Sequence, residues 1–407
     1  MGKHRLDEVL DKRLCSGCGA CAYLGGDYGV AMVDVPEVGR RPEGIRLLPL
    51  RVKDEILAVC PGSEVESPGW GRHQPSADEV LVGPAVQIWE GWAADPEMRL
   101  AGSSGAVVTA LAAYALERLN MALVLHTGMD PAVPWQNQTI VSRDRAQLIA
   151  NSGSRYTTSS PVEALRVIEQ SDRPCVFIGK PCDVAAVARL RRMRPQLDRN
   201  LGLVLSFFCA GTPTSQATRR LTADLGFDDS QIVSVRYRGR GWPGHFVVTD
   251  RGGKQAQMTY DESWGILAGR QRQLRCHLCP DGLGELADVT GGDAWHRKED
   301  GSPGISMILA RTERGRDVVV SALRDGYLDA VPSGYHEVVQ AQGLVERRKT
   351  VQSRLAALRT FGLPATRFPG LRLAESAAQL SVRERVREYL GMARRVVVRG
   401  FLKAEPR

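Results

Sequence analysis

The chain has 407 residues, of which 43% are hydrophobic and 25% are charged. This length suffices for two or three domains, and the composition excludes disorder as the main state. The formal net charge of +8 suggests a polyanionic partner, but residues 341–407 alone hold 15 Lys and Arg against 5 Asp and Glu. The rest of the chain is slightly acidic, so the basic character belongs to the C-terminal tail.

The sequence shows no segment that would direct the chain to a membrane or out of the cell. No apolar run approaches the roughly 18–20 residues that span a bilayer, and residues 1–4 do not lead into a signal peptide. We therefore expect a cytoplasmic protein. Its nine cysteines would then lie in a reducing compartment, where metal or redox roles are favoured over structural disulfides.

The first 80 residues contain the strongest motif. Cys15, Cys18 and Cys21 are two residues apart, and Cys60 follows later with a proline directly after it. Small residues between the first three cysteines let the backbone curl around one point, and a remote Cys-Pro is typical of the fourth ligand in bacterial ferredoxins. Zinc is the alternative, but zinc sites usually pair two separated hairpins. We predict an iron–sulfur cluster in a ferredoxin-like domain over residues 1–80.

Residues 81–335 alternate short apolar runs with helical patterns, which is typical of an α/β fold. We predict a mixed α/β core. Cys175 lies within one apolar strand and is interpreted as a buried core thiol. The expected helices are 103–119, 161–169, 184–192 and 318–324, and the expected strands are 121–125, 175–178, 201–208, 232–237, 246–249 and 306–311.

A second set of cysteines is more dispersed. Cys182 and Cys209 each follow a predicted strand, and Cys276 and Cys279 form a Cys-x2-Cys pair. Ligands usually bind at the carboxyl ends of strands in open α/β sheets. A lone Cys-x2-Cys pair is as often a zinc as an iron motif, but together these cysteines predict a four-thiolate site. His277 lies between two better ligands, so we interpret it as a neighbour of the site.

Three segments are candidates for binding an organic cofactor. Residues 102–105 lead into an alanine-rich helix whose free N–H groups suit a pyrophosphate. In residues 151–156, Arg155 could hold a phosphate and Tyr156 could stack on a ring, although a polar surface loop fits this segment equally well. Asp293, with a Trp and a His close behind it, follows the Cys-x2-Cys pair. The G-x-G-x-x-G fingerprint is absent, so a dinucleotide would not be bound in the Rossmann manner.

The tail, residues 336–407, is expected to be a basic helical extension. Ser381 and Glu384 fit the capping box that begins a helix, and an apolar stripe with flanking arginines follows at helical spacing. This helix either packs on the body or contacts a partner or a membrane surface. The stripe consists of Val382, Val386, Tyr389, Leu390, Ala393 and Val397, and the arginines are Arg383, Arg387, Arg394 and Arg395.

The order of these motifs resembles the coenzyme F420 hydrogenase/dehydrogenase beta-subunit family, which also includes ferredoxin-dependent reductases of the chlorophyll pathway. The resemblance covers roughly residues 10–335. Besides the cysteine run and the Cys-Pro, it rests on residues 103–109, 153–156, 179–182, 209–211, 275–279, 287–288 and 292–295.

The resemblance implies FAD and two [4Fe–4S] clusters. One cluster would be held by the first four cysteines, and the core cluster by Cys182, Cys209, Cys276 and Cys279. Residues expected near the cofactors by position are Ser103, Ser104, Gly105, Thr109, Gly153, Ser154, Arg155, Lys180 and Asp293.

Two positions depart from the family's pattern. Ala106 stands where a second glycine is common, and Lys180 where a small or hydroxyl residue is common. A lysine beside the flavin or a cluster would favour the reduced, anionic form. We therefore expect the potential of that cofactor to be shifted upward.

These features predict an oxidoreductase that passes electrons from ferredoxin or reduced F420 through two clusters and FAD to an unidentified small molecule. His296, His245 and Tyr156 are candidate proton donors. The alternatives are a non-catalytic electron-relay subunit of a larger complex and a zinc-stabilised binding protein. The basic tail is not accompanied by the aromatic and basic residues of a nucleic-acid-binding module, so we do not expect DNA or RNA as a partner. The basic tail would instead contact an acidic electron donor or an anionic membrane surface.

Overall fold

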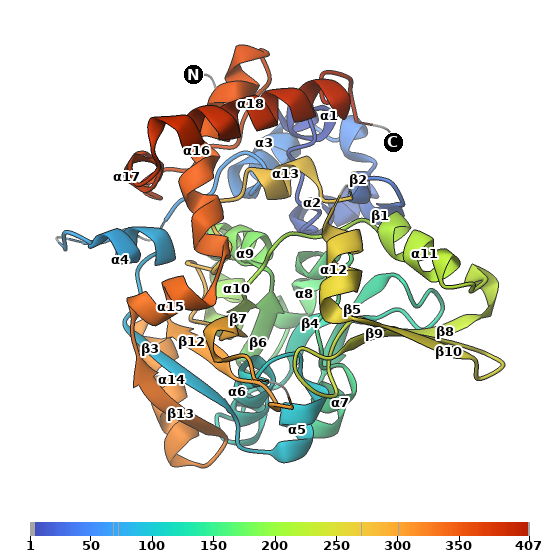
Figure 1. Cartoon of the computed structure of the whole chain (residues 1–407), viewed down its shortest axis with the longest axis vertical. Helices are drawn as coiled ribbons and strands as arrows, with labels where there is room; N and C mark the ends of the chain where they lie inside the picture. Colours follow the sequence, from blue (N-terminus) through green and yellow to red (C-terminus); the bar gives the residue numbers. More distant parts are fainter. Residues whose placement is uncertain (1–4, 68, 72, 270, 300, 406–407) are drawn as a thin grey trace.

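An eight-stranded mixed sheet forms the centre of the computed structural model, which describes residues 5–405 apart from 68, 72, 270 and 300 (Figure 1). The strand order is β13-β3-β12-β11-β7-β6-β4-β5. The four strands β11, β7, β6 and β4 are parallel, and the outer strands pair antiparallel with their neighbours. This confirms the predicted mixed α/β class. The bounds are β3 (Gln87–Ala93), β4 (Val124–Met129), β5 (Asn137–Ser142), β6 (Cys175–Gly179), β7 (Leu201–Phe207), β11 (Val289–Asp293), β12 (Ser306–Ala310) and β13 (Leu328–Ser333).

Helices cover both faces of this sheet, so its central strands are apolar on both sides. Val176 packs with α6 (Val107–Glu117) and α14 (Glu313–Arg324), whereas the next residue, Phe177, packs with α9 (Pro181–Met193) on the other face. The alternation follows from the two-residue period of a strand. Shorter helices around these three are α5 (Pro96–Ala101), α7 (Arg145–Ala150), η3 (Pro161–Ala164), α8 (Arg166–Glu169), α10 (Pro195–Asn200) and η5 (Trp295–Arg297).

A three-stranded antiparallel sheet projects from one side of the body (Figure 1, right). Two of its strands are joined by the glycine-rich loop of residues 238–244, as the sequence predicts. Phe246 and Val248 face a hydrophobic cluster that also includes helical residues. The elements are α11 (Ser215–Asp224), η4 (Asp229–Gln231), β8 (Ile232–Arg236), β9 (His245–Asp250), β10 (Gln255–Thr259) and α12 (Tyr260–Ala268).

The N-terminal segment shares its hydrophobic core with the body. Tyr23 and Ile56 belong to the same hydrophobic cluster as Phe177 and Val184. The predicted domain boundaries at residues 80 and 335 stay predictions, and side-chain packing crosses the first of them. The elements are α1 (Leu6–Asp11), α2 (Ala20–Gly25), η1 (Gly26–Tyr28), β1 (Ala31–Val35), β2 (Gly39–Glu43), η2 (Ile45–Leu47), α3 (Leu50–Val59) and α4 (Ala77–Val82).

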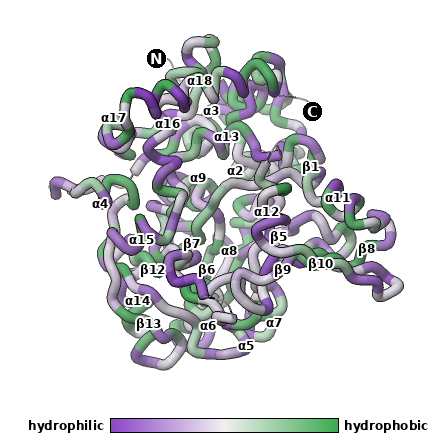
Figure 2. Tube along the Cα trace, in the orientation of Figure 1, coloured by the Kyte–Doolittle hydropathy of each residue, from purple (hydrophilic) through white to green (hydrophobic). Residues whose placement is uncertain are grey.

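The last three helices of the tail return to the N-terminal segment as a layer, drawn in orange and red in the upper part of Figure 1. Arg41 of β2 forms a buried two-pronged ion pair with Glu405, with N···O distances of 2.6 and 2.9 Å. In Figure 2 the layer alternates between hydrophilic and hydrophobic stretches. Across the described residues, no helix is both long and apolar enough to cross a bilayer. The helices are α15 (Tyr335–Ala341), α16 (Leu344–Thr360), α17 (Leu373–Ala378) and α18 (Val382–Val398).

The predicted capping box begins α18, but the helix packs through a different face from the predicted stripe. Ser381 Oγ accepts the backbone N–H of Glu384. Met392 and Val396 are fully buried, and Tyr389 and Ala393 pack partly beside them. The rest of the predicted stripe is exposed, because α18 has two apolar faces and only one contacts the body. The exposed fractions are 67% for Val382, 49% for Val386, 58% for Leu390 and 61% for Val397.

Three predicted helices begin at other residues, one of them α14, which is expected from residue 318 and begins at Glu313. The helix expected from residue 103 begins at Val107, because Ala106 has φ +55°, a left-handed conformation that does not continue a helix. The helix expected from residue 184 begins at Pro181, where proline is favoured at the first position. The sequence did not predict strands β3, β5, β11 and β13 or helices α12 and α16.

The buried His126 on β4 makes stability depend on pH. It contacts Ser142 Oγ at 2.8 Å, and burial lowers the pKa of His126 from 6.5 to about 4. The unfolded chain therefore binds a proton that the folded protein excludes, so this stability is complete above pH 6.5 and is lost as the pH falls toward 4. Substituting His126→Asn should remove up to about 3 kcal/mol of the loss in unfolding free energy between pH 7 and 4.

Urea unfolding at several pH values measures this difference. The exposed His336→Asn variant is the control and should keep the pH dependence of the unaltered protein. Equal pH dependence in the His126→Asn variant and the unaltered protein would contradict the prediction.

Candidate functional site

Cys15, Cys18, Cys21 and Cys60, here the N-terminal cysteine group, line one small cavity. Cys15 lies shortly after α1, Cys21 lies in the first turn of α2, and Cys60 ends α3. The structure therefore brings together the four cysteines that the sequence groups. The other side chains around the cavity are mainly apolar and include Leu6, Val9, Leu10, Met32, Ile45 and Ile56.

Glycines shape the loop that carries the first three cysteines. Gly17 and Gly19 have φ of +70° and +97°, which favour glycine. A Cβ on Gly19 would lie 2.7 Å from the carbonyl oxygen of Ser160. The Val162 N–H donates to the carbonyl of Cys18 at 3.2 Å. The loop is therefore held directly against the body.

Cys182, Cys209, Cys276 and Cys279, here the core cysteine group, line a second small cavity. Cys182 follows β6 in the first turn of α9, and Cys209 follows β7. Because β6 and β7 are parallel neighbours, their carboxyl ends meet at one edge of the sheet. Cys276 lies in the short helix α13 (Leu274–His277), and Thr212 N–H approaches its sulfur at 3.5 Å.

Burial makes these thiols reluctant to ionise. It raises the pKa of Cys60 to about 11, and that of Cys209 to about 12, in each case with help from a neighbouring cysteine. The pKa of Cys182 is also raised by burial. Buried thiols without a cation are inert, whereas a metal ligand must be a thiolate. His277 lines neither cavity, and burial with nearby arginines lowers its pKa to about 2.

The two cavities are neighbours, because Ser16 lines both of them. Lys180, predicted as a cofactor neighbour, lines the core cavity. Its Nζ lies 2.6 Å from Oδ1 of Asp183 and donates to the Ser159 carbonyl at 2.9 Å. Burial lowers the pKa of Lys180, but the Asp183 carboxylate outweighs burial and holds the pKa above its usual value. The lysine charge is therefore balanced locally, and its effect on a potential stays a prediction.

Three of the predicted flavin residues come together from two loops. The Ser154 N–H donates to Ser103 Oγ. Gly153 has φ +100°, and a Cβ there would lie 3.6 Å from the Arg238 carbonyl and 3.8 Å from Ser103 Oγ. Residues 102–105 and 151–155 therefore meet the loop of residues 238–244.

The other predicted flavin residues mainly contact protein. Ser104 Oγ donates to the Ile305 carbonyl at 2.9 Å, and the Gly105 N–H donates to Ser306 Oγ at 2.9 Å. Thr109 lies half-buried in the first turn of α6. The Arg155 guanidinium donates to oxygens of the protein, and its predicted contact with a phosphate stays a prediction. The acceptors are Asn137 Oδ1 and the carbonyls of Pro134, Gln136 and Val235.

A buried arginine within a stack of aromatic rings lies beside these loops. Arg238 pairs with Asp293 at 2.7 and 2.9 Å, and Trp242 Nε1 donates to the same carboxylate at 2.7 Å. The ring of Trp295 stacks on Trp242 at 5.5 Å and on Tyr260 at 5.4 Å between centroids. The sequence predicts Asp293 as a residue of the site, but it does not predict the aromatic residues around Arg238. The glycine-rich turn of residues 238–244 was the signal available in the sequence, but it could not show which distant segments contact that turn.

The three candidate proton donors lie in different surroundings. Tyr156 belongs to the aromatic group, since its ring lies 4.7 Å from Trp264 and its Oη accepts from Arg238 at 3.4 Å. His296 Nε2 lies 3.2 Å from Glu90 Oε1. His245 is exposed at the start of β9. The structure therefore groups only Tyr156 with the aromatic rings.

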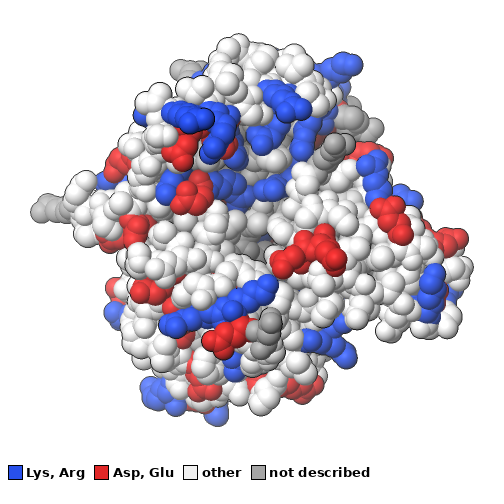
Figure 3. Space-filling model, viewed as in Figure 1, with Lys and Arg blue, Asp and Glu red and all other residues white. Residues whose placement is uncertain are grey.

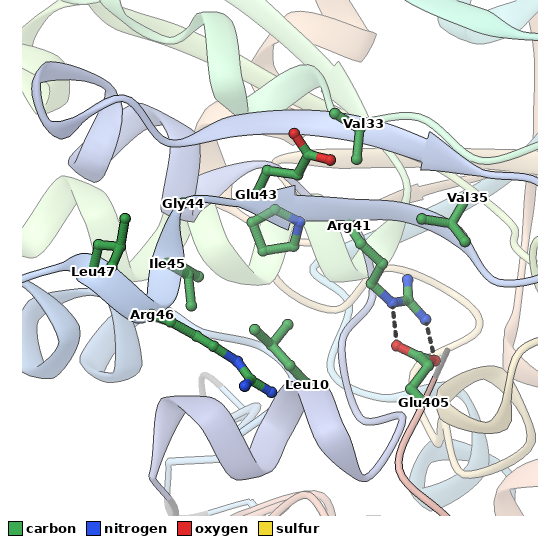
Figure 4. A pocket seen from close by; sticks show the side chains of 11 residues that line it. Leu10, Val33, Val35, Arg41, Glu43, Gly44, Ile45, Arg46, Leu47 and Glu405 are labelled. Atoms are coloured by element: carbon green, nitrogen blue, oxygen red, sulfur yellow. Dashed lines mark hydrogen bonds and ion pairs between the residues drawn. The ribbon is translucent and has the colours of Figure 1, made fainter. Parts of the chain in front are cut away.

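A larger cavity of about 410 Å³ lies in the N-terminal segment beside the Arg41–Glu405 ion pair (Figure 4). Val33 and Val35 of β1 and Ile45 contribute to its largely apolar wall. None of the predicted site residues lines this cavity. The cysteine groups therefore remain the centre of the candidate site.

The fold and the site together define a class of protein in which a mixed α/β body carries two groups of four cysteines. Two family models of the beta subunit of coenzyme F420 hydrogenase/dehydrogenase match the body, which carries the core cysteine group. The model of its N-terminal part matches residues 88–166, and the model of its C-terminal part matches residues 172–334. Together they cover more than half of the chain. The chain belongs to the coenzyme F420 hydrogenase/dehydrogenase beta-subunit family.

Several similar proteins carry the names of F420-dependent enzymes or of their subunits. The coenzyme F420 hydrogenase subunit beta of Methanothermobacter thermautotrophicus is 24% identical over 300 residues, or 70% of this chain and 99% of that one. The coenzyme F420-dependent sulfite reductase of Methanocaldococcus jannaschii is 23% identical over 78% of this chain and 47% of its own. A chain of the F420-reducing [NiFe] hydrogenase complex from Methanosarcina barkeri has the same fold, with a TM-score of 0.55, 22% identity and coverage of 70% and 97%.

Gly19 should be essential to the stability of the N-terminal group. An alanine there would combine an unfavourable φ with a close contact to the Ser160 carbonyl. We expect Gly19→Ala to lower the free energy of unfolding by at least about 1–2 kcal/mol. Gly265→Ala in the interior of α12, where a Cβ meets open space, should instead stabilise by up to about 1 kcal/mol. Denaturant unfolding compares the two, and equal stability of both variants would contradict the expectation.

Proposed function

We propose that the protein passes electrons from ferredoxin or reduced F420 through two [4Fe–4S] clusters and FAD to a small-molecule substrate. The observation that carries the proposal is the division of eight cysteines into two groups of four, each around its own cavity. Family membership supports oxidoreductase chemistry, since relatives include F420-dependent hydrogenase and formate dehydrogenase subunits.

The donor sets fit iron–sulfur clusters better than zinc. Four cysteines are the ligand set of a [4Fe–4S] cluster. A zinc ion would draw four sulfurs to about 2.3 Å from one point. The run of Cys15, Cys18 and Cys21 with the remote Cys60-Pro matches the ligand pattern of ferredoxin clusters, whereas zinc sites usually pair two separated hairpins.

FAD would lie between the loops of residues 102–105 and 153–154 and the aromatic group. Clusters pass single electrons, whereas a flavin can collect them singly and deliver a hydride. The buried Arg238–Asp293 pair fixes Trp242 and Tyr156 on either side of it. Because Tyr156 Oη accepts from Arg238, its own O–H can donate to a substrate. Tyr156 is therefore the preferred proton donor among the three candidates.

A relay subunit of a larger complex is the alternative function, because similar chains are subunits of F420 hydrogenases. The tail favours a self-contained enzyme. It extends beyond the family models, which end at residue 334, and its residues Met392 and Val396 belong to the same hydrophobic cluster as Cys60. Turnover of a substrate by the isolated chain with reduced ferredoxin or reduced F420 would separate the two functions.

Anaerobically purified protein should contain about eight iron and eight sulfide per chain and release FAD on denaturation. Cys18→Ser and Cys209→Ser should each remove about half of the iron, because each breaks one group of four. Cys175→Ser is the control, because Cys175 is buried in β6 and lines neither cavity. Metal and flavin analysis measures these contents, and zinc without flavin would contradict the proposal.

The exposed stripe of α18 is proposed as the contact for an acidic electron carrier such as a ferredoxin. One face of α18 packs into the hydrophobic cluster that includes Cys60, and the other is exposed. A carrier docked on the exposed face would lie across α18, about 10–12 Å of helix, from that cluster. Figure 3 shows basic side chains gathered over α16 and α18. Those flanking the stripe are Arg383, Arg387 and Arg394, which are exposed.

Charge reversal tests this contact without disturbing the buried face. The triple variant Arg383→Glu, Arg387→Glu and Arg394→Glu should slow reduction by ferredoxin at least about tenfold at low salt. The effect should shrink at high salt, and reduction by an artificial dye should not change. The control reverses the exposed Arg118, Arg220 and Arg251. Unchanged ferredoxin kinetics together with lost binding to anionic vesicles would assign the stripe to a membrane instead.

A further inference from the structure

Ser16 lies at the boundary between the two cysteine cavities and lines both. Its side chain is only 8% exposed. Its Oγ is buried and has no hydrogen-bond partner among the described residues. A buried hydroxyl without an acceptor is costly and rare in native proteins. The hydroxyl is therefore suited to a group bound in one of the cavities.

The backbone around Ser16 is held from both sides. The Gly17 N–H donates to Cys15 Sγ at 3.3 Å, and Ser160 Oγ donates to the Gly17 carbonyl at 2.8 Å. A Cβ on Gly17 would approach the Arg40 carbonyl to 2.8 Å. The peptide before Gly17 therefore cannot rotate freely, and the Ser16 side chain stays between the two cavities.

Lys180, which lines the core cavity, already has partners. Lys180 Nζ is within 2.9 Å of both carboxylate oxygens of Asp183 and of the Ser159 carbonyl. Sulfur atoms of an iron–sulfur cluster accept hydrogen bonds, and these bonds raise the reduction potential because they stabilise the more negative, reduced state. Arg347 Nε of the core cavity also lacks a partner among the described residues, but only Ser16 combines an unpaired donor with a position that lines both cavities.

We propose that Ser16 Oγ donates a hydrogen bond to a sulfur of a cluster in one of the two cavities and raises the potential of that cluster. The inference rests on the proposed function, since it requires both clusters. Its consequence is a smaller or larger potential step between the clusters, depending on which of them accepts the bond. Ser16 therefore helps to set the direction of electron transfer.

The test is a redox titration of the anaerobic holoprotein, followed by electron paramagnetic resonance. Ser16→Ala should shift one midpoint potential to a more negative value while iron content stays at that of the unaltered protein. Ser16→Thr, which keeps the hydroxyl, should leave that potential closer to the original. Thr157→Val is the matched control, because Thr157 Oγ1 is also buried without a partner among the described residues but lines neither cavity.

Unchanged potentials of both clusters in Ser16→Ala would overturn the inference and leave the proposed function intact. If Ser16→Ala does not retain iron, Ser16→Gly and Ser16→Thr replace it, and equal potentials in these two variants overturn the inference. An unaltered protein with fewer than two clusters would instead contradict the proposed function.

Discussion

The contact between the loop of residues 15–21 and the backbone of residues 159–163 determines how the two cysteine groups lie relative to each other. The loop can lie against the Ser160 carbonyl because Gly19 has no side chain. The hydrogen bond from the Val162 N–H to the Cys18 carbonyl then holds the loop at that distance from the body. Ser160 holds Gly17 in the same way. If the loop stood one side chain farther out, Ser16 would no longer line both cavities.

The parallel strands supply the other half of the arrangement. β6, β7 and β11 lie next to one another and run in the same direction, so Cys182, Cys209 and Asp293 are delivered to one edge of the sheet. The thiols of Cys182 and Cys209 and the Arg238–Asp293 pair therefore lie at the same edge of the sheet. This proximity follows from the topology rather than from local sequence.

Cysteine spacing could be interpreted from the sequence because it encodes local geometry. The run at Cys15 and the strand-end positions of Cys182 and Cys209 both placed thiols where the structure gathers them. For Arg155 the sequence could not show that oxygens of the protein surround the guanidinium, so its contact with a phosphate stays a prediction. The aromatic group was missed because its rings come from distant segments.

The tail illustrates the same limit. Helical spacing identified the apolar residues of α18, but it could not show which of two apolar faces would meet the body. Met392 and Val396 are buried, whereas Val382 and Leu390 are exposed. Which face of α18 is buried depends on the apolar side chains that the neighbouring α16 presents to it, and the sequence of α18 alone does not contain that information. The fold class itself was predictable, because alternating strand and helix patterns with buried strands admit few architectures.

The ion pair between Arg41 and Glu405 joins residues that are 364 positions apart in the chain. During synthesis, the β1–β2 hairpin leaves the ribosome long before its partner carboxylate exists. At about 5–20 residues per second, the delay is on the order of tens of seconds. For that time Arg41 lacks the carboxylate that balances its charge in the folded protein. The N-terminal segment therefore spends this interval without the tail that covers it in the finished protein.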